Sequence, residues 1–582
     1  MINSKNLNKI TFSLIIFALI ICVGIIYVSS TSTAIKTSEY QEKMFGDDVL
    51  NLDIEVDEED WQGLLENPMT KEYISGNLTI NGTKFSTVGI RTKGNNSLSQ
   101  VASMEDSDRY SLQFKSNKFV KGQTFYGLDS FCINNIIGDS TYMKDYISYD
   151  LMNYIGVDTP LKNYANVTVN GEDFGFYIAL ERYGKSFLDR VYNTSGGELY
   201  NVKNSMGQKN NSMKEGNMEL PEFNNDRKED LNRSDMDREM KPPDRNMEGF
   251  PQEGLEGGRG GVGGMGDRGG GSLIYTDDNI SSYSSIFDNA VFSQNSSKDK
   301  ERVIKAIKNL NEGNDLEKYI DVDKTLRYLA AHTVVVNLDS YSSNMAQNYY
   351  LYERNGKLTV LPWDYNYSFG GFQSGSSTDV INFPIDTPIS GVSMEDRPLI
   401  NKLLEVEEYK EKYHEYLQEI VNGYFFSGLF EETINSLDNK INEYVKNDPS
   451  SFTTYEKYEA SLPILMELGN LRAESINGQL NGTIPSTTEE QEANEDLLVD
   501  GSSVNLSSLG TMGGGFGGRG EMQDQIQGEE NNLAHGQGKR PNTQDSRGPS
   551  STVNKEYIGI AIFSIVLLIG ALVFIFRTKK NY

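Results

Sequence analysis

The chain has 582 residues and is acidic, with 83 Asp and Glu residues against 54 Lys and Arg and a formal net charge of −29. It has no long basic block, which argues against nucleic-acid binding as its main task, because neutralising phosphates needs clustered Lys and Arg. Its two cysteines exclude a disulfide framework, and its three histidines disfavour a histidine-rich metal site or a Ser-His-Asp triad. If the chain carries chemistry, we expect carboxylates to perform it.

Two uncharged apolar runs lie near the ends of the chain, at residues 10–28 and 557–576. Each is about as long as a helix must be to cross a hydrocarbon core roughly 30 Å thick. Neither run carries the polar stripe of a helix that packs in a protein core. We therefore expect two transmembrane helices. The first run, preceded by Lys5 and Lys9, also has features of a cleaved signal peptide, but an uncleaved anchor is our preferred interpretation.

Basic residues beside these runs predict how the chain is oriented. Residues 1–9 contain two lysines, and residues 577–582 contain Arg577, Lys579 and Lys580. Lys and Arg close to a membrane span favour the cytoplasmic side. Both short ends are therefore expected in the cytoplasm, and the region between the runs is expected outside it.

Residues 46–203 are predicted to be rich in strands. Apolar and polar residues alternate as in half-buried strands, and Asn-Gly pairs at 81–82 and 170–171 indicate tight type I′ hairpins. A helix is expected over residues 142–154, ended by Gly156. The strand-like runs lie at residues 49–56, 76–80, 87–92, 110–114, 131–136, 167–169 and 174–180.

The composition changes abruptly after residue 203. Residues 204–271 have few aliphatic or aromatic side chains, so they cannot bury enough apolar area to offset the entropy of ordering, and we expect a disordered insertion. Residues 272–482 show helical patterns at 299–310, at 323–333 and from Arg397 to about 478. A low-complexity linker is predicted at residues 483–554.

The densest cluster of polar residues follows an apolar run at residues 333–336. It places Asp339 and Asn344 in a loop, and a hairpin then brings Asp364 to an aromatic and glycine-rich turn. Phosphoryl transfer uses such a set, because one carboxylate orients the attacking hydroxyl while another carboxylate and an amide hold the metal. The step from Asp339 to Asn344 equals the D-x-x-x-x-N step of a kinase catalytic loop. Loop Asp and Asn also commonly serve only as turn formers, and that alternative stays open.

Five stretches of the chain, in order, resemble the CotH spore-coat kinase family. They are VGIRTKGNNS at 88–97, GLDSFCINNIIGDSTYMKDYISYDL at 127–151, VNGEDFGFYIALERYGKSFL at 169–188, GELYNVK at 197–203 and LDSYSSNMAQNYYLYERNGKLTVLPWDYNYSFGGF at 338–372. The resemblance implies a divergent protein-kinase-like fold and ATP-dependent phosphorylation of serine in spore-coat proteins. By this resemblance Asp339 is the catalytic aspartate and Asp364 binds metal. Asn344 is then the second metal ligand, with Asn348 as the alternative.

The resemblance also implies that the strand-rich part contacts the nucleotide. Cationic side chains there would neutralise triphosphate charge, although a solvated strand edge is an equal alternative for each of them. Lys93 stands where we expect an arginine in the commoner family form, and a lysine lacks bidentate geometry. The candidate nucleotide-binding residues are Arg91, Lys93, Arg109, Lys115, Asp145, which would pair with one of these cations, and Glu181, for which a surface salt bridge is equally plausible.

These observations predict an α+β, divergent protein-kinase-like fold of two lobes, at residues 46–203 and 272–482, with terminal transmembrane helices and disordered glycine-rich segments. The predicted function is that of an atypical protein kinase, which transfers phosphate from ATP with Mg²⁺ or Mn²⁺ to serine-rich spore-coat or envelope proteins. The alternatives are a non-catalytic surface adhesin or envelope scaffold, and phosphoryl or nucleotidyl transfer to a cell-surface polymer. We expect the protein in the cell membrane, with its domain on the extracytoplasmic side and no nucleic-acid partner.

Overall fold

The computed structural model describes residues 38–203, 270–292 and 295–510. All of them belong to the first of two compact units, which ends at Phe516. The two apolar runs, both chain ends and residues 511–554 of the expected linker lie outside the described residues, as does nearly all of the expected insertion at 204–271. In the part of the chain that is described, no helix is both long and apolar enough to cross a membrane.

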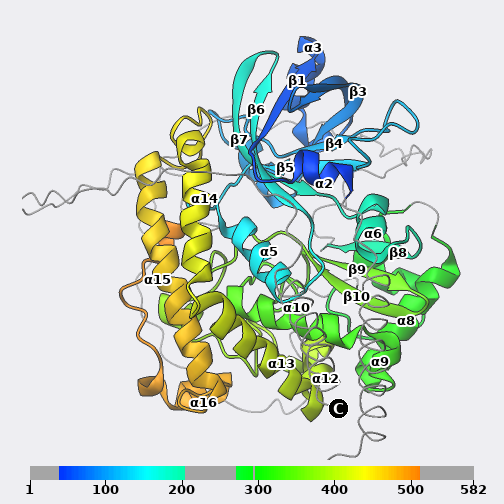
Figure 1. The fold of residues 1–582 in the computed structure, drawn as a ribbon. Helices are drawn as coiled ribbons and strands as arrows, with labels where there is room; N and C mark the ends of the chain where they lie inside the picture. Colours follow the sequence, from blue (N-terminus) through cyan, green and yellow to red (C-terminus); the bar gives the residue numbers. More distant parts are fainter. Residues whose placement is uncertain (1–37, 204–269, 293–294, 511–582) are drawn as a thin grey trace, which may run out of the picture. The chain divides into compact units, whose positions relative to one another are not determined.

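Seven strands of the first part of the chain close into a barrel (Figure 1). Six neighbouring pairs are antiparallel, and the barrel closes where β1 pairs in parallel with β6, with Leu52 opposite Val167. In order around the barrel the strands are β1 (Leu50–Val56), β2 (Ile74–Ile80), β3 (Thr83–Thr92), β4 (Leu112–Lys115), β5 (Ser130–Asn134), β7 (Glu172–Glu181) and β6 (Lys162–Val169).

The expected kinase-like fold of two lobes is therefore wrong. The strand-rich part is a closed mixed barrel. The physical reason is that alternation specifies which residues face the core but not which strands pair. The closing pair joins strands more than 100 residues apart, so no local pattern reveals it.

Local sequence explains the strands themselves. In β1 the apolar residues Leu50, Leu52 and Ile54 are buried and face the barrel core, whereas the residues between them are more exposed. The predicted Asn-Gly turns are present: Asn81 and Gly82 have φ of 47° and 82°, as a type I′ turn requires. The short helices in this part of the chain are α2 (Glu39–Met44), α3 (Glu58–Glu66), η1 (Pro68–Thr70), α4 (Asn96–Ala102) and α6 (Lys185–Tyr192).

A second, three-stranded antiparallel sheet follows the barrel in the order β10-β9-β8. Its strands are β8 (Glu198–Val202), β9 (Tyr349–Arg354) and β10 (Lys357–Pro362), and β9 and β10 are joined by a turn at Asn355-Gly356. Helices near this sheet are η3 (Ile280–Tyr283), α7 (Ser284–Phe287), α8 (Ser297–Glu312) and α9 (Leu316–Tyr319).

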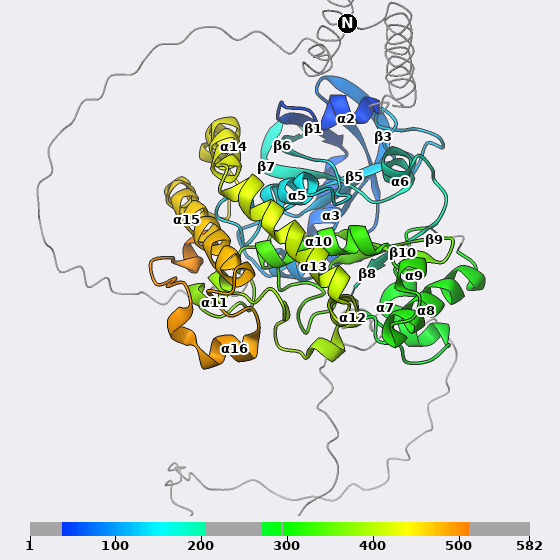
Figure 2. The ribbon, with the colours of Figure 1, turned by 60° about the horizontal axis from the view of Figure 1, so that its bottom comes forward.

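The remaining described residues are helical and share one apolar core with the second sheet. The helix α5 (Lys144–Tyr154) packs against both the barrel strand β6 and α10 (Val322–Val335), and so connects the two parts (Figures 1 and 2). The other elements are α11 (Ser377–Ile381), η4 (Met394–Asp396), α12 (Pro398–Leu404), α13 (Glu407–Ile420), the π-helical turn η5 (Val421–Phe425), α14 (Leu429–Lys446) and α15 (Tyr455–Leu480).

Residues 485–510, which we expected to begin the linker, pack on the helical part. They form α16 (Thr488–Ala493) and the short turns η6 (Glu495–Leu497) and η7 (Leu506–Leu509), which packs on α15. Val499 exchanges two hydrogen bonds with Asn382, donating its N–H at 3.0 Å and accepting the side-chain amide at 2.8 Å. Leu509 is buried. The structure therefore places this segment on the domain.

Candidate active site

Asp339 lies in the loop that follows α10, where Val336 leaves the helix with a φ of 45°. The side chain of Asp339 is only 7% exposed. Its carboxylate accepts hydrogen bonds from Gln347 Nε2 at 2.8 Å and Asn348 Nδ2 at 3.0 Å. Burial raises the pKa of Asp339 to about 7, and the charge of Asp364 acts in the same direction, against the two amide donors. This carboxyl group therefore exchanges a proton near neutral pH.

Asp364 follows β10 in a strained backbone conformation, with a φ of 67°. Its N–H donates to Tyr149 Oη at 3.1 Å, and its carbonyl accepts from Asn337 Nδ2 at 3.0 Å. Non-glycine residues held at positive φ often lie at functional sites, where the surrounding structure maintains the strain. The bonds on both sides of Asp364 fix its main chain.

A third carboxylate, that of Asp145 on α5, joins this centre. Asp145 Oδ1 accepts a hydrogen bond from the N–H of Tyr365 at 2.7 Å. Burial raises the pKa of Asp145 to about 7, followed by the charge of Asp364. The structure thus brings together three acidic residues, of which the first and the last, Asp145 and Asp364, are 219 positions apart in the sequence.

His332 connects the Asp339 loop to the Asp364 turn from within the core. Its Nδ1 is 2.9 Å from Tyr365 Oη, and its Nε2 is 2.9 Å from Ser342 Oγ and 3.0 Å from Ser340 Oγ. Burial lowers the pKa of His332 to about 4, so the ring is neutral at physiological pH. On its other side the loop is held by Arg397, whose Nε donates to the carbonyl of Tyr341 at 2.7 Å.

Lys93, just after β3, lies between the barrel and the acidic centre. Its ammonium group donates to Asn134 Oδ1 and lies 5.8 Å from the centre of the Trp363 ring. Its charge lowers the pKa of Asp145, opposing the larger effect of burial. The described structure shows no ion pair between Asp145 and Lys93, so only this electrostatic influence corresponds to the expected pairing of Asp145 with a barrel cation.

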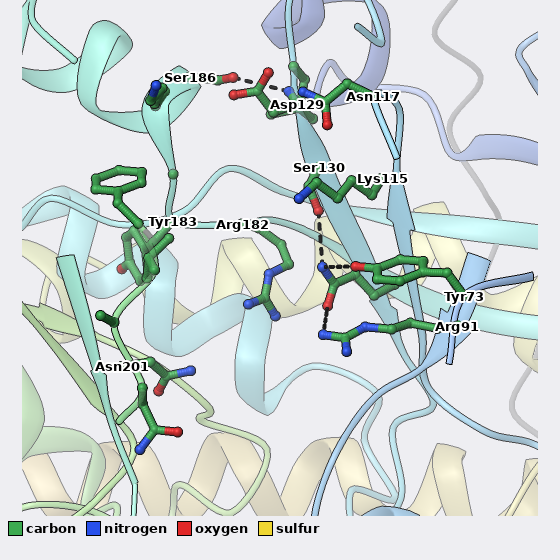
Figure 3. Close-up of a pocket in the computed structure, with 18 of the residues that line it drawn as sticks. Tyr73, Arg91, Lys115, Asn117, Asp129, Ser130, Arg182, Tyr183, Ser186 and Asn201 are labelled. Atoms are coloured by element: carbon green, nitrogen blue, oxygen red, sulfur yellow. Dashed lines mark hydrogen bonds between the residues drawn. The ribbon is translucent and has the colours of Figure 1, made fainter. Parts of the chain in front are cut away.

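A basic pocket of about 670 Å³ has Arg91, Lys115 and Arg182 in its lining (Figure 3). Arg182 stacks over the Trp363 ring, with its guanidinium carbon 5.7 Å from the ring centre. Arg91 donates to Gln113 Oε1 at 2.9 Å, and Gln113 in turn donates to Tyr73. Among the described residues that line the pocket, five are cationic and one, Asp129, is acidic; the cations are Arg91, Lys115, Arg182, Lys185 and Lys203.

Cations in and around this pocket act on one another. Burial lowers the pKa of Lys203 to about 8, and the charges of Arg182, Lys71, Lys93 and Arg91 act in the same direction. Within the described structure these five side chains take no part in the ion pairs, which involve other cations. In a chain with a net charge of −29, such a concentration of unneutralised positive charge indicates a site for an anion.

The structure places the other candidate residues as follows. Asn344 is exposed, whereas the alternative amide, Asn348, bonds to Asp339. Arg109 is buried away from the pocket in an ion pair with Asp448, at 2.7 Å. Glu181 is buried as well and pairs with Arg190 at 2.5 Å. Arg91 and Lys115 line the pocket.

Sequence reasoning missed His332, Arg182 and Lys203. Arg182 and Lys203 lie inside the stretches that carried the family resemblance, and Arg182 directly follows Glu181, so a search for cations in those stretches would have found both. No sequence signal marked His332, because a lone histidine on an apolar helix is usually a core residue.

We tested whether the acidic centre fits a divalent cation. In the described ranges no group of three or more His, Cys, Asp or Glu side chains is arranged to hold a metal ion. Mg²⁺ on a nucleotide, however, needs only one or two protein carboxylates, because phosphate oxygens and water supply the other ligands. Asn337 Oδ1, beside Asp364, is buried without a hydrogen-bond partner. Asp364 and its amide neighbours therefore fit a cation that arrives with phosphate.

The described structure thus combines a closed barrel, a helical part and a buried acidic centre close to a basic pocket. The family model described as "CotH kinase protein" matches residues 90–240 and 266–476, more than half of the chain, and this protein belongs to that family. The chain is also similar to "Inner spore coat protein H" of Bacillus subtilis (strain 168). The two are 22% identical over 367 residues, which cover 62% of this chain and 82% of the relative.

Proposed function

We propose that this protein transfers the γ-phosphate of ATP to serine hydroxyls of spore-coat or envelope proteins. The convergence of Asp339, Asp364 and Asp145 beside a basic pocket carries the proposal. Membership of the CotH family supports it, and so does the similarity to an inner spore coat protein, which also favours a place at the cell envelope.

Each part of the site has a task in this proposal. Asp339 orients the acceptor hydroxyl and takes up its proton, which suits a carboxylate with a pKa of about 7. The pocket cations hold the triphosphate and spread its charge. Arg91, Arg182 and Lys203 are the side chains placed for this. Lys93 lies between the pocket and Asp145, and so keeps positive charge next to the acidic centre.

The metal ion would be Mg²⁺ or Mn²⁺, held by Asp364 with Asn348 or Asn337 as an amide partner. When bound, it supplies charge neutralisation on the transferred phosphoryl group. The strained but fixed main chain of Asp364 keeps its carboxylate directed without further reorganisation.

The test is phosphate transfer by the full-length protein from labelled ATP, with Mn²⁺ or Mg²⁺, to a serine-rich acceptor protein. Transfer that is lost in Asp339→Asn and in Asp364→Asn supports the proposal. Asp173→Asn, at the exposed start of β7, is the matched control and is expected to retain transfer. Absence of transfer together with absence of metal-dependent ATP binding by calorimetry would overturn it.

A non-catalytic envelope scaffold is the second candidate, and one observation favours it. Both carboxylate oxygens of Asp339 already accept amide donors, from Gln347 and Asn348, so the group is satisfied without any substrate. A scaffold would show binding to coat or envelope proteins that is unaffected by Asp339→Asn. The kinase proposal instead requires these amide bonds to be exchanged for the acceptor hydroxyl.

A further inference from the structure

The last described residues return to the candidate active site from the far end of the domain. We call residues 499–510 the strap. Gly501 fastens it to α11, because its carbonyl accepts from Ser377 Oγ at 2.8 Å and its N–H donates to Thr378 Oγ1 at 3.2 Å. The strap lies beyond residue 476, where the family match ends.

The end of the strap docks on the turn that precedes α5. The carbonyl of Leu509 accepts a hydrogen bond from the N–H of Ser140 at 3.2 Å. The carbonyl of Gly510 accepts one from Lys144 Nζ at 2.8 Å. Lys144 is fully buried, and burial lowers the pKa of its ammonium group to about 8. The strap thus supplies a hydrogen-bond acceptor to a buried charge, which would otherwise be costly to hold.

Contact between the two backbones is close at Gly510. A Cβ atom there would lie 2.7 Å from the carbonyl oxygen of Gly138 and 2.9 Å from the nitrogen of Ser140. Real Cβ atoms do not approach backbone at such distances, so only glycine fits. Gly482, nearer the start of the C-terminal segment, has the same φ of +78° but nothing within 4 Å of its Cβ position.

The same turn contacts both sides of the acidic centre. On one side Asp139 accepts the N–H of Lys144 at 2.9 Å and so caps α5 one residue before Asp145. On the other side the carbonyl of Ile137 accepts Asn366 Nδ2 at 3.2 Å, and Gly138 lies against the ring of Tyr367. Burial raises the pKa of Tyr367, and the charges of Asp364 and Asp339 add to this, which places the phenol near both carboxylates.

We propose that the strap is a positioning element of the candidate active site. Leu509 and Gly510 fix the turn at 137–140, and this turn sets the distance between α5, which carries Asp145, and the segment that carries Asp364. The inference rests on the proposed phosphotransfer for its catalytic consequence. The docking of the strap can be tested separately from that activity.

The experiment compares Gly510→Ala with Gly482→Ala in the full-length protein. Both variants introduce the same side chain at the same φ, but only the first forces the strap off the turn. We expect Gly510→Ala to lower kcat for phosphate transfer by about tenfold or more, because small displacements of reacting groups are costly, with KM for ATP within about twofold. Gly482→Ala is expected to keep the kcat of the unmodified protein.

Hydrogen–deuterium exchange tests the docking of the strap separately from the proposed phosphotransfer. Gly510→Ala should speed amide exchange in residues 136–145 and 364–368 but not in β9 and β10, whereas Gly482→Ala should change neither. Faster exchange in a protein that shows neither phosphotransfer nor metal-dependent ATP binding supports the docking and overturns the proposed function. Equal kcat and equal exchange in the two glycine variants overturn the positioning proposal. If Gly510→Ala does not fold, Lys144→Met takes its place in both measurements, because it removes the hydrogen bond that Lys144 Nζ donates to the Gly510 carbonyl. The same changes in kcat and amide exchange are then expected.

Discussion

Arg109 offers the sharpest test of how the barrel is joined to the helical part. Its guanidinium donates to both carboxylate oxygens of Asp448, at 2.7 and 2.8 Å, and to Ser450 Oγ at 2.9 Å. It also donates to the carbonyl of Asn135 at 3.0 Å and stacks 4.8 Å from the Tyr177 ring. Both side chains of the ion pair are 0% exposed. Sequence analysis had placed Arg109 among the nucleotide contacts.

The substitution Arg109→Met keeps much of the volume and removes the charge. It leaves the Asp448 carboxylate buried with Tyr142 Oη and Ser450 as its remaining partners. Removing one partner of a buried ion pair typically lowers the free energy of unfolding by about 3–5 kcal/mol, because the other charge is left uncompensated. We expect a loss of that size in urea unfolding followed by circular dichroism. The affinity for ATP, measured by calorimetry on folded protein, should not change.

Two comparisons make the Arg109 prediction refutable. Lys84→Met breaks an ion pair with Glu55 in which both side chains are nearly half exposed, so it should change stability by less than about 1 kcal/mol. Adding Asp448→Leu to Arg109→Met should restore part of the loss, since the buried charge is then gone. A fully stable Arg109→Met protein with weakened ATP binding would refute the structural assignment and restore the nucleotide contact.

Three further predictions concern the acidic centre and the basic pocket. Burial and then Asp364 raise the pKa of Asp145 from 3.8 to about 7, so this group contributes stability at low pH that is lost as the pH rises through about 7. Asp145→Asn removes this titration. Measured in EDTA, the substitution should raise the free energy of unfolding by ~2–3 kcal/mol more at pH 8 than at pH 5, because each pKa unit corresponds to ~1.4 kcal/mol. An equal effect at both pH values contradicts this prediction. Because the pKa of Lys203 is lowered to about 8, affinity for ATP should fall between pH 7 and 9, and Lys203→Met should weaken binding roughly tenfold and flatten that dependence. His332→Leu removes hydrogen bonds to Tyr365, Ser340 and Ser342 and should lower the free energy of unfolding by about 2–3 kcal/mol. It should also change kcat more than KM, by lowering kcat. An unchanged kcat would show that the ring does not position the loop.

Elements that depend on local pattern were predictable. The Asn-Gly hairpins, the alternation in β1 and helices α5, α8 and α10 lie where the sequence placed them, because turn chemistry and periodicity act over a few residues. Barrel closure was not predictable, since it depends on the parallel pairing of β1 with β6 across more than 100 residues. The docking of residues 485–510 was not predictable from their low-complexity sequence, because it uses backbone hydrogen bonds, as at Val499, and a few separate apolar side chains, Val504 and Leu509.

Part of the candidate site was predictable from the sequence as well, and part was not. Asp339 and Asp364 were chosen from spacing and resemblance, and the structure brings them together. The amides beside Asp339 are those of Gln347 and Asn348, and Asn348 is four residues beyond the position that the kinase step indicates. Arg109 is a cation that precedes a strand and Glu181 ends one, but the sequence cannot show that an ion-pair partner already neutralises each of them. Predicting this neutralisation requires knowing which distant residues form ion pairs.

The sheets leave little opportunity for another chain to join them by strand addition. In the described structure the barrel has no edge strand, and another segment bonds to each outer strand of the three-stranded sheet. On β8 the carbonyl of Leu199 accepts from Val291 at 2.8 Å, and on β10 the carbonyl of Leu358 accepts from Asp321 at 2.8 Å. Proteins with exposed edges tend to polymerise through them. An assembly through either of these two sheets would therefore rest on side-chain contacts and not on added strands, which allows contacts to be specific and reversible without templating a fibre.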